Sequence, residues 1–131
     1  MANIEGTRDL KAWFGSYDFA VDGGVAGTIT LRSNDGPIPN GSYVVGGLLE
    51  VVTAATSGGS ATVAVQTVAA NDTVNAAAIS GAPWSSTGRK SVIPAFTGAT
   101  SLKTTAATSP AIVIGTADLT AGKFNVVLFY R

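Results

Sequence analysis

Carboxylates are the side chains in this sequence that could perform acid–base chemistry. Two of the eight, Asp18 and Glu50, lie within stretches expected to form strands. Adjacent strands could bring them together, and two carboxylates a few ångströms apart are what a glycan hydrolase uses. The alternative is a strand-borne carboxylate that pairs with Lys or Arg or points into solvent. The other six are Glu5, Asp9, Asp22, Asp35, Asp72 and Asp118. Most of them stand at expected turns or caps, where Asp is favoured for backbone reasons.

Nucleophilic and metal chemistry have little support in the sequence. The chain has no His and no Cys, which excludes disulfides, thiolate zinc sites and imidazole or thiol catalysis within one chain. A catalytic Ser would need Lys as its base, and no Ser-x-x-Lys pattern occurs. Asn34-Asp35 and Asn71-Asp72 offer oxygen ligands for calcium, but neither resembles a dedicated calcium loop. We therefore predict a protein that is not an enzyme and that has no metal and no cofactor.

The composition is poor in charge. Charged residues make up 12% of the 131 residues, with eight basic and eight acidic side chains, against roughly 25% in an average protein. No basic footprint for nucleic acid is present, and no apolar stretch of the ~20 residues that span a membrane, so we expect neither partner. The first residues also lack the apolar segment of a secretory signal. Because a charge-poor surface is poorly protected against association, we expect much of it to be covered in an assembly.

Short β-branched runs separated by Gly, Asn, Asp and Pro dominate the chain, a pattern typical of sandwiches and barrels. The expected fold is all-β: a single-domain antiparallel β-sandwich or barrel of about seven or eight strands, with at most one short helix. Residues 1–9 are expected to form an N-terminal arm before a β domain of residues 10–131. The strands are expected at 10–21, 25–32, 42–55, 60–68, 90–93, 100–104, 110–116 and 123–131, and the helix at 71–79.

Glycine positions predict the breaks in this pattern. Gly46-Gly47 inside a long run predicts a bulge or bend. The stretch 22–27 is rich in glycine, but strands flank it on both sides, so we expect a hairpin turn and not a phosphate loop. Residues 56–59 predict a second hairpin, and residues 118–122 a further turn.

Five residues are the candidate interface. The run 10–21 is apolar on both faces, so one face can meet the core and the other a partner. Trp13 is interpreted as core or subunit interface. Trp84, in a loop after Pro83, fits an interface anchor as well as core packing. The basic pair Arg89-Lys90 could meet an acidic patch on a partner or be solvated. The candidate set is Trp13, Phe14, Trp84, Arg89 and Lys90.

Three segments together resemble a known class of protein. The first is 18–24 followed by 28–31, the second is 39–41 leading into 49–54 and 57–64, and the third is 119–126. They resemble small virion structural proteins of tailed bacteriophages, of the capsid decoration, or cement, type. The resemblance covers residues 10–131 and brings no catalytic residue with it.

That resemblance implies a small β domain on the outside of an expanded capsid, often assembled as a homotrimer. The implied partners are the major capsid protein and other copies of the chain, and the implied location is the capsid surface of the virion. The alternative within the virion is a tail, head-fibre or receptor-contact module in which Trp84 serves carbohydrate recognition. The alternative from another class is the carboxylate-dependent glycan hydrolase.

Overall fold

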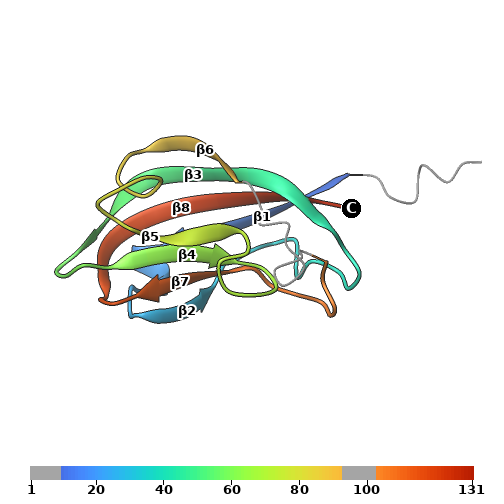
Figure 1. The fold of residues 1–131 in the computed structure, drawn as a ribbon, viewed down its shortest axis with the longest axis horizontal. Coiled ribbons are helices and arrows are strands. Elements are labelled where there is room, and N and C mark those ends of the chain that lie inside the picture. Colours follow the sequence, from blue (N-terminus) through green and yellow to red (C-terminus); the bar gives the residue numbers. More distant parts are fainter. Residues whose placement is uncertain (1–9, 93–102) are drawn as a thin grey trace, which may run out of the picture.

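A computed structural model describes residues 10–92 and 103–131, and in these residues the chain forms a β-sandwich (Figure 1). The long sheet has the strand order β1-β8-β3-β6 and the short sheet the order β2-β7-β4-β5, with every pair antiparallel. This confirms the predicted all-β antiparallel fold, and it settles the architecture as two sheets. The elements are β1 (Lys11–Asp18), α1 (Phe19–Asp22), β2 (Gly27–Thr30), β3 (Val44–Ser57), β4 (Thr62–Gln66), β5 (Val74–Ala78), β6 (Gly88–Val92), β7 (Ala111–Gly115) and β8 (Leu119–Tyr130).

Alternation along the strands explains how the two sheets bury one core. In β8, Phe124, Val126 and Leu128 are buried and alternate with Lys123 and Asn125. Because successive strand residues point to opposite faces, one face of β8 meets the core and the other faces outward. In β7 (AIVIG), three of the five residues are buried, as suits a strand in the middle of a sheet.

Aromatic side chains fill the centre of the core. Tyr17 from β1 stacks on Phe124 from β8, with ring centroids 5.5 Å apart. Trp84, from the loop before β6, meets the same Phe124 ring in a tilted arrangement at 4.9 Å. Trp13 on β1 is also buried, and its indole Nε1 donates a hydrogen bond to the Gly36 carbonyl at 2.7 Å. These contacts join β1, β8 and two loops into one packed unit.

The helix prediction for 71–79 is wrong, because those residues form a loop and strand β5. Asn71 has φ 61°, and its Oδ1 accepts from Ala76 N at 3.0 Å. Asp72 is buried and accepts from the backbone N–H groups of residues 67, 68 and 69 and from the Thr73 hydroxyl. These side chains therefore cap the loop after β4 and not a helix. The short helix is α1, for which Asp18 accepts from Ala20 N as the N-cap.

Both predicted hairpin turns instead connect the two sheets. Residues 22–27 lead from β1 in the long sheet to β2 in the short sheet, and residues 58–61 lead from β3 to β4. The turn predicted at 118–122 is wrong, because residues 119–122 belong to β8 and pair with the end of β3; the connection from β7 is formed by residues 116–118. A glycine-rich segment between two strands predicts a change of chain direction. It does not predict whether the next strand joins the same sheet or the other sheet.

The bulge predicted at Gly46-Gly47 is confirmed. The register between β3 and β8 shifts between Val44 and Gly46. A Cβ added at Gly47 would collide with the Val127 carbonyl oxygen, so no larger residue fits there without a shift of the backbone.

Parts of two predictions lie outside the described residues. These are the N-terminal arm at residues 1–9 and most of the strand expected at 100–104. In the part of the chain that the structure describes, no helix has the length and apolar character needed to cross a membrane.

Candidate interaction surfaces

One edge of the long sheet is closed by the chain itself. Along β1, the N–H groups of residues 14, 16 and 18 point away from β8, and each is bonded within the chain. Phe14 N donates to Asp35 Oδ2 at 2.9 Å, and Asp18 N donates to Asp22 Oδ2 at 2.9 Å. Ser16 exchanges two backbone hydrogen bonds with Arg32, at 2.8 and 3.0 Å. From residue 14 to residue 18, the edge of β1 is therefore already occupied and offers no free ladder to another strand.

A salt bridge and a tyrosine reinforce this closed edge. Arg32 Nε lies 2.9 Å from Asp22 Oδ1. The Tyr17 hydroxyl donates to the Gly23 carbonyl at 2.6 Å. Burial raises the pKa of Tyr17 to about 12, and the nearby carboxylates of Asp22 and Asp18 add to the increase. The neutral phenol is therefore a structural donor over the whole physiological range.

The outward face of the long sheet carries a row of polar side chains across its four strands. Ser16 Oγ on β1 donates to Asn125 Oδ1 on β8 at 3.1 Å, and Asn125 Nδ2 donates to Glu50 Oε1 on β3 at 3.1 Å. Arg89 on β6 stands opposite Glu50 in the register. Residues opposite each other share a face, so Arg89 completes the row.

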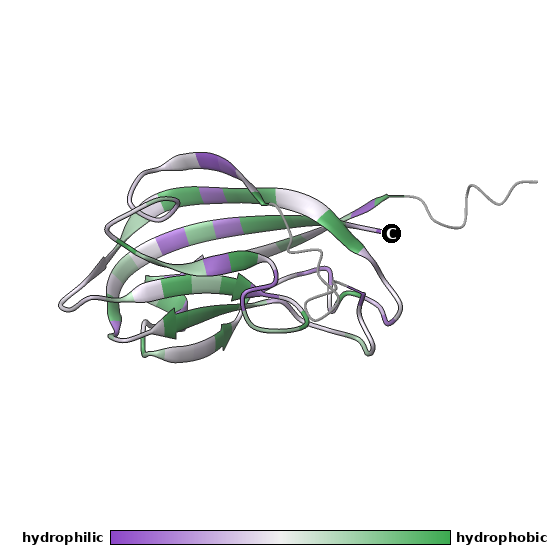
Figure 2. Cartoon of the chain, viewed as in Figure 1, coloured by the Kyte–Doolittle hydropathy of each residue, from purple (hydrophilic) through white to green (hydrophobic). Residues whose placement is uncertain are grey.

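Beside the polar row lies an apolar one. Phe14, Val127 and Leu48 are register neighbours on β1, β8 and β3, and Ala12 and Phe129 form the next step. Phe14 is 58% exposed and Leu48 is 39% exposed. We name Ala12, Phe14, Leu48, Val127 and Phe129 the outer apolar patch. Figure 2 shows hydrophobic and hydrophilic residues alternating along β3 and β8.

The structure places the five predicted interface residues in three different settings. Trp13 and Trp84 are 1% and 0% exposed, so in the single chain both have the core position that the sequence left open for them. Within the described residues, Trp84 Nε1 has no hydrogen-bond partner. Phe14 lies in the outer apolar patch, and Arg89 lies in the polar row. Lys90 belongs to the opposite face of β6, and its Nζ donates to the Ser86 carbonyl at 2.5 Å.

The sequence analysis missed Leu48, Val127 and Phe129 as surface residues. Their signal is the same as that of Phe14, namely a strand that is apolar on both faces. In the structure, Phe14 and Arg89 lie on one face but at opposite edges of the sheet, and the Trp residues lie behind it.

Asp18 and Glu50 do not form the carboxylate pair that was considered. Asp18 stands opposite Lys123 on β8, and Glu50 stands opposite Asn125 on the far side of the same strand. Two strand spacings separate their backbones by roughly 10 Å, before the offset along the strand is added. That is wider than the separation of about 5–5.5 Å in a retaining glycosidase. Each carboxylate also already accepts a hydrogen bond, from Ala20 N and from Asn125 Nδ2.

The two candidate calcium segments use their carboxylates for other purposes. Asp35 accepts from Phe14 N, and Asp72 accepts the four hydrogen bonds described above. In the ranges 10–92 and 103–131, no three acidic, His or Cys residues gather as a metal site would need.

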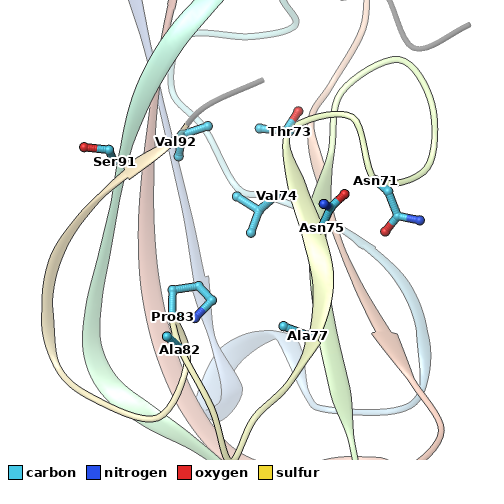
Figure 3. A pocket seen from close by; sticks show the side chains of 9 residues that line it. All are labelled: Asn71, Thr73, Val74, Asn75, Ala77, Ala82, Pro83, Ser91 and Val92. Carbon is cyan, nitrogen blue, oxygen red and sulfur yellow. The ribbon is translucent and has the colours of Figure 1, made fainter. Parts of the chain in front are cut away.

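A hollow of about 400 Å³ lies between the edge strands β5 and β6, on the side of the sandwich opposite β1 (Figure 3). Val74 and Ala77 line it from β5, Pro83 from the loop before β6, and Val92 from β6. Figure 3 shows Val74, Pro83 and Val92 directed into the gap between the two strands. The sandwich is thus closed along β1 and hollowed between β5 and β6.

Comparison with known proteins finds this fold in phage capsids. No protein-family model matches the chain, and no curated protein matches it. A chain of the cyanophage Pam1 capsid asymmetric unit has a TM-score of 0.58 at 19% identity, over 94% of this chain and 84% of that chain. A chain of the acidic stable capsid structure of Helicobacter pylori bacteriophage KHP30 has a TM-score of 0.60 at 15% identity, over 92% and 86%. At these identities the likeness is one of fold.

Proposed function

We propose that this protein is a bacteriophage capsid decoration, or cement, protein, which binds the outside of the head as an oligomer and stabilises it. The observation that carries the proposal is the shared sandwich, which extends over most of this chain and most of a chain in each of two phage capsid structures. The segments of the sequence that resemble small virion proteins point the same way.

The size of the matched sandwich domain supports an accessory role. Each match covers more than four fifths of this chain and more than four fifths of the capsid chain, so the matched chains are similar in length. A small single β domain has the size of an added subunit. In this role the protein is not an enzyme, because cementing a shell needs buried contact area and no chemistry.

The outer apolar patch is the surface that we assign to this contact. It is apolar, it lies on a rigid sheet, and it borders the polar row that ends at Arg89. An apolar centre with a polar rim is the anatomy of protein interfaces. The patch alone is small, so a stable contact of ~800 Å² per partner would extend onto its polar surroundings.

We further propose that the oligomer is a homotrimer and that the major capsid protein is its partner. An icosahedral shell offers three-fold positions, and a symmetric oligomer matches such a position with identical contacts. The low charge of the chain favours a surface that is covered in this way. The location is then the capsid surface of the virion.

A receptor-contact module is the less favoured alternative. That function was linked to a Trp84 ring that stacks on sugars, but the Trp84 side chain is buried against Phe124. No other Trp in the described residues is exposed, since Trp13 is buried as well. The capsid role does not depend on an exposed indole.

The proposal is tested by reconstitution. Heads are prepared from the encoding phage with the gene for this chain deleted, and the purified protein is added back. We expect saturable binding and a higher temperature of DNA release. The mass of the free protein, measured by light scattering, tests the trimer separately, with three times 13.1 kDa as the expected value. Heads that bind no protein would contradict the decoration role.

A further inference from the structure

Among the described residues, β6 forms the second edge of the long sheet, and the ladder alternation determines which of its backbone groups point outward. The β1 N–H groups at 14, 16 and 18 point away from β8. Hydrogen-bonding direction alternates along antiparallel strands, so β8 uses residues 125, 127 and 129 to bond β3. By the same rule β3 uses 47, 49 and 51 to bond β6. Arg89 and Ser91 are therefore the β6 residues whose N–H and C=O groups point away from the sheet.

The two edges of the long sheet differ in whether their outward backbone groups are bonded within the chain. Every outward N–H of β1 from residue 14 to residue 18 is bonded within the chain. In the part of the chain that the structure describes, β6 is the last strand of its sheet and pairs with β3 alone. An edge strand with free ladder groups is a template for an added strand.

The hollow beside β6 would receive side chains of such a strand. Side chains of an added strand alternate between the two faces of the sheet. Those on the inner face, next to Val92, would enter the hollow of about 400 Å³ lined by Val74, Pro83 and Val92. The lining also includes Ala77 and Ala82, with polar groups from Asn71, Thr73, Asn75 and Ser91, so its apolar part suits small apolar side chains.

The positive charge of Arg89 indicates that the added strand is acidic. Arg89 lies on the outer face of β6, and no ion pair is found for it among the described residues. Glu50 stands opposite it in the register and accepts from Asn125, but no ion pair between Glu50 and Arg89 is found among the described residues. Acidic side chains on the outer face of an added strand would meet the guanidinium as charge-assisted hydrogen bonds.

A second copy of the chain fits this edge poorly. Pairing β6 with β6 of another copy would bring the Arg89-Lys90 pairs together, and like charges on facing strands are destabilising. The edge of β1 is already bonded within the chain at Asp18, and the two edge strands of the short sheet, β2 (GTIT) and β5 (VNAAA), carry no acidic residue. The edge therefore suits a foreign segment.

We propose that β6 binds an extended, acidic segment of another protein by strand addition, with apolar side chains of that segment in the hollow between β5 and β6. This goes beyond the proposed function and does not depend on it, because a free peptide can test it. The addition would occur at Arg89 and Ser91, the two residues with outward ladder groups.

The experiment titrates a seven-residue peptide of alternating Val and Glu into ¹⁵N-labelled full-length protein. We expect the Arg89 and Ser91 amide resonances to shift and their hydrogen exchange to slow. Ser91→Pro removes the outward N–H at an edge position that tolerates proline, and it should weaken binding about tenfold or more. The control Ser91→Ala keeps the N–H and should bind as the wild type does.

Charge is tested in the same titration. A peptide with Lys in place of Glu should bind about tenfold more weakly, and Arg89→Glu should reduce that preference. Arg89→Glu also covers the case in which Ser91→Pro fails to fold, because it leaves the backbone unchanged. Absence of shifts at Arg89 and Ser91 with millimolar acidic peptide would overturn the proposal. So would shifts that persist in folded Ser91→Pro or that appear equally with the basic peptide.

Discussion

Asp35 Oδ2 accepts a hydrogen bond from the backbone N–H of Phe14 at 2.9 Å. This bond fixes the main chain at Phe14 and leaves its ring exposed. Phe14 is 58% exposed on the outward face of β1, while the edge of that strand is closed. From residue 14 to residue 18, a partner can therefore reach β1 through its face but not through its edge. This arrangement suits a contact made by the outer apolar patch.

Phe14→Ser tests that patch. Because the ring is exposed, we expect the free energy of unfolding to fall by about 1 kcal/mol or less, while binding to depleted heads weakens about tenfold or more. Sedimentation with heads gives the binding, and thermal denaturation gives the stability. Val25→Ser is the matched control, since Val25 is also exposed but lies in the connection between β1 and β2. Equal loss of binding in both variants would remove the patch from the contact.

Asp72→Asn should destabilise the protein strongly. The buried carboxylate accepts three backbone N–H groups and one hydroxyl at 2.8 to 2.9 Å, and an amide cannot accept all of them. We expect a loss of about 2–4 kcal/mol, or roughly 10 °C in Tm. Asp118→Asn is the control, because that exposed carboxylate accepts only the Ala26 N–H in the described residues, and it should cost about 1 kcal/mol or less. Similar Tm values for the two variants would contradict this account of the loop.

The raised pKa of Tyr17 predicts that the free energy of unfolding falls at high pH. Its pKa is raised from 10.0 to about 12 in the folded protein by burial and by the nearby Asp22 and Asp18. The folded state therefore holds the proton longer than the unfolded state, so the stabilisation is complete below pH 10 and disappears as pH rises towards 12. The shift corresponds to about 2–3 kcal/mol.

Tyr17→Phe isolates this effect. The variant lacks the hydrogen bond to the Gly23 carbonyl, so at neutral pH it should be less stable by about 1 kcal/mol. Its unfolding free energy should decline less than that of the wild type between pH 10 and pH 12. Denaturant unfolding of both proteins at several pH values measures the difference. Parallel curves over this range would show that Tyr17 ionises normally.

Both indoles are predicted to be shielded from solvent. Trp13 and Trp84 are buried, so acrylamide should quench their fluorescence weakly, and added oligosaccharides should leave the emission unchanged. Denatured protein supplies the fully accessible reference. Strong quenching, or a saturable change with a sugar, would favour the receptor-contact alternative.

Apolar runs bounded by turn residues were sufficient to predict most of the strands. The run that forms β3 is mostly apolar, Phe124, Val126 and Leu128 of β8 recur with a period of two, and the glycine pair at 46–47 indicated the bulge. The helix failed because 71–79 is short and Ala-rich, a composition that pairing with β4 overrides, and because Asn71 and Asp72 cap a loop. Local turn chemistry also could not distinguish a hairpin from a connection between sheets.

The surfaces were harder to predict than the fold. A strand that is apolar on both faces does not reveal which face is buried, so Phe14 was identified but Leu48, Val127 and Phe129 were not. Trp84 lies in a loop of turn-forming residues, and its partner Phe124 is distant in the sequence. Only the tertiary structure decides that this indole is buried. The basic pair divides between two faces because it lies on a strand, which leaves Arg89 alone on the outer face.

The most direct test of the central claim is a pair of electron cryomicroscopy maps of the phage head, with and without this protein. The decoration account predicts difference density on the outer surface of the capsid, at symmetry-related positions, into which the two-sheet sandwich fits. Identical head maps, or density for the sandwich on the tail alone, would contradict it.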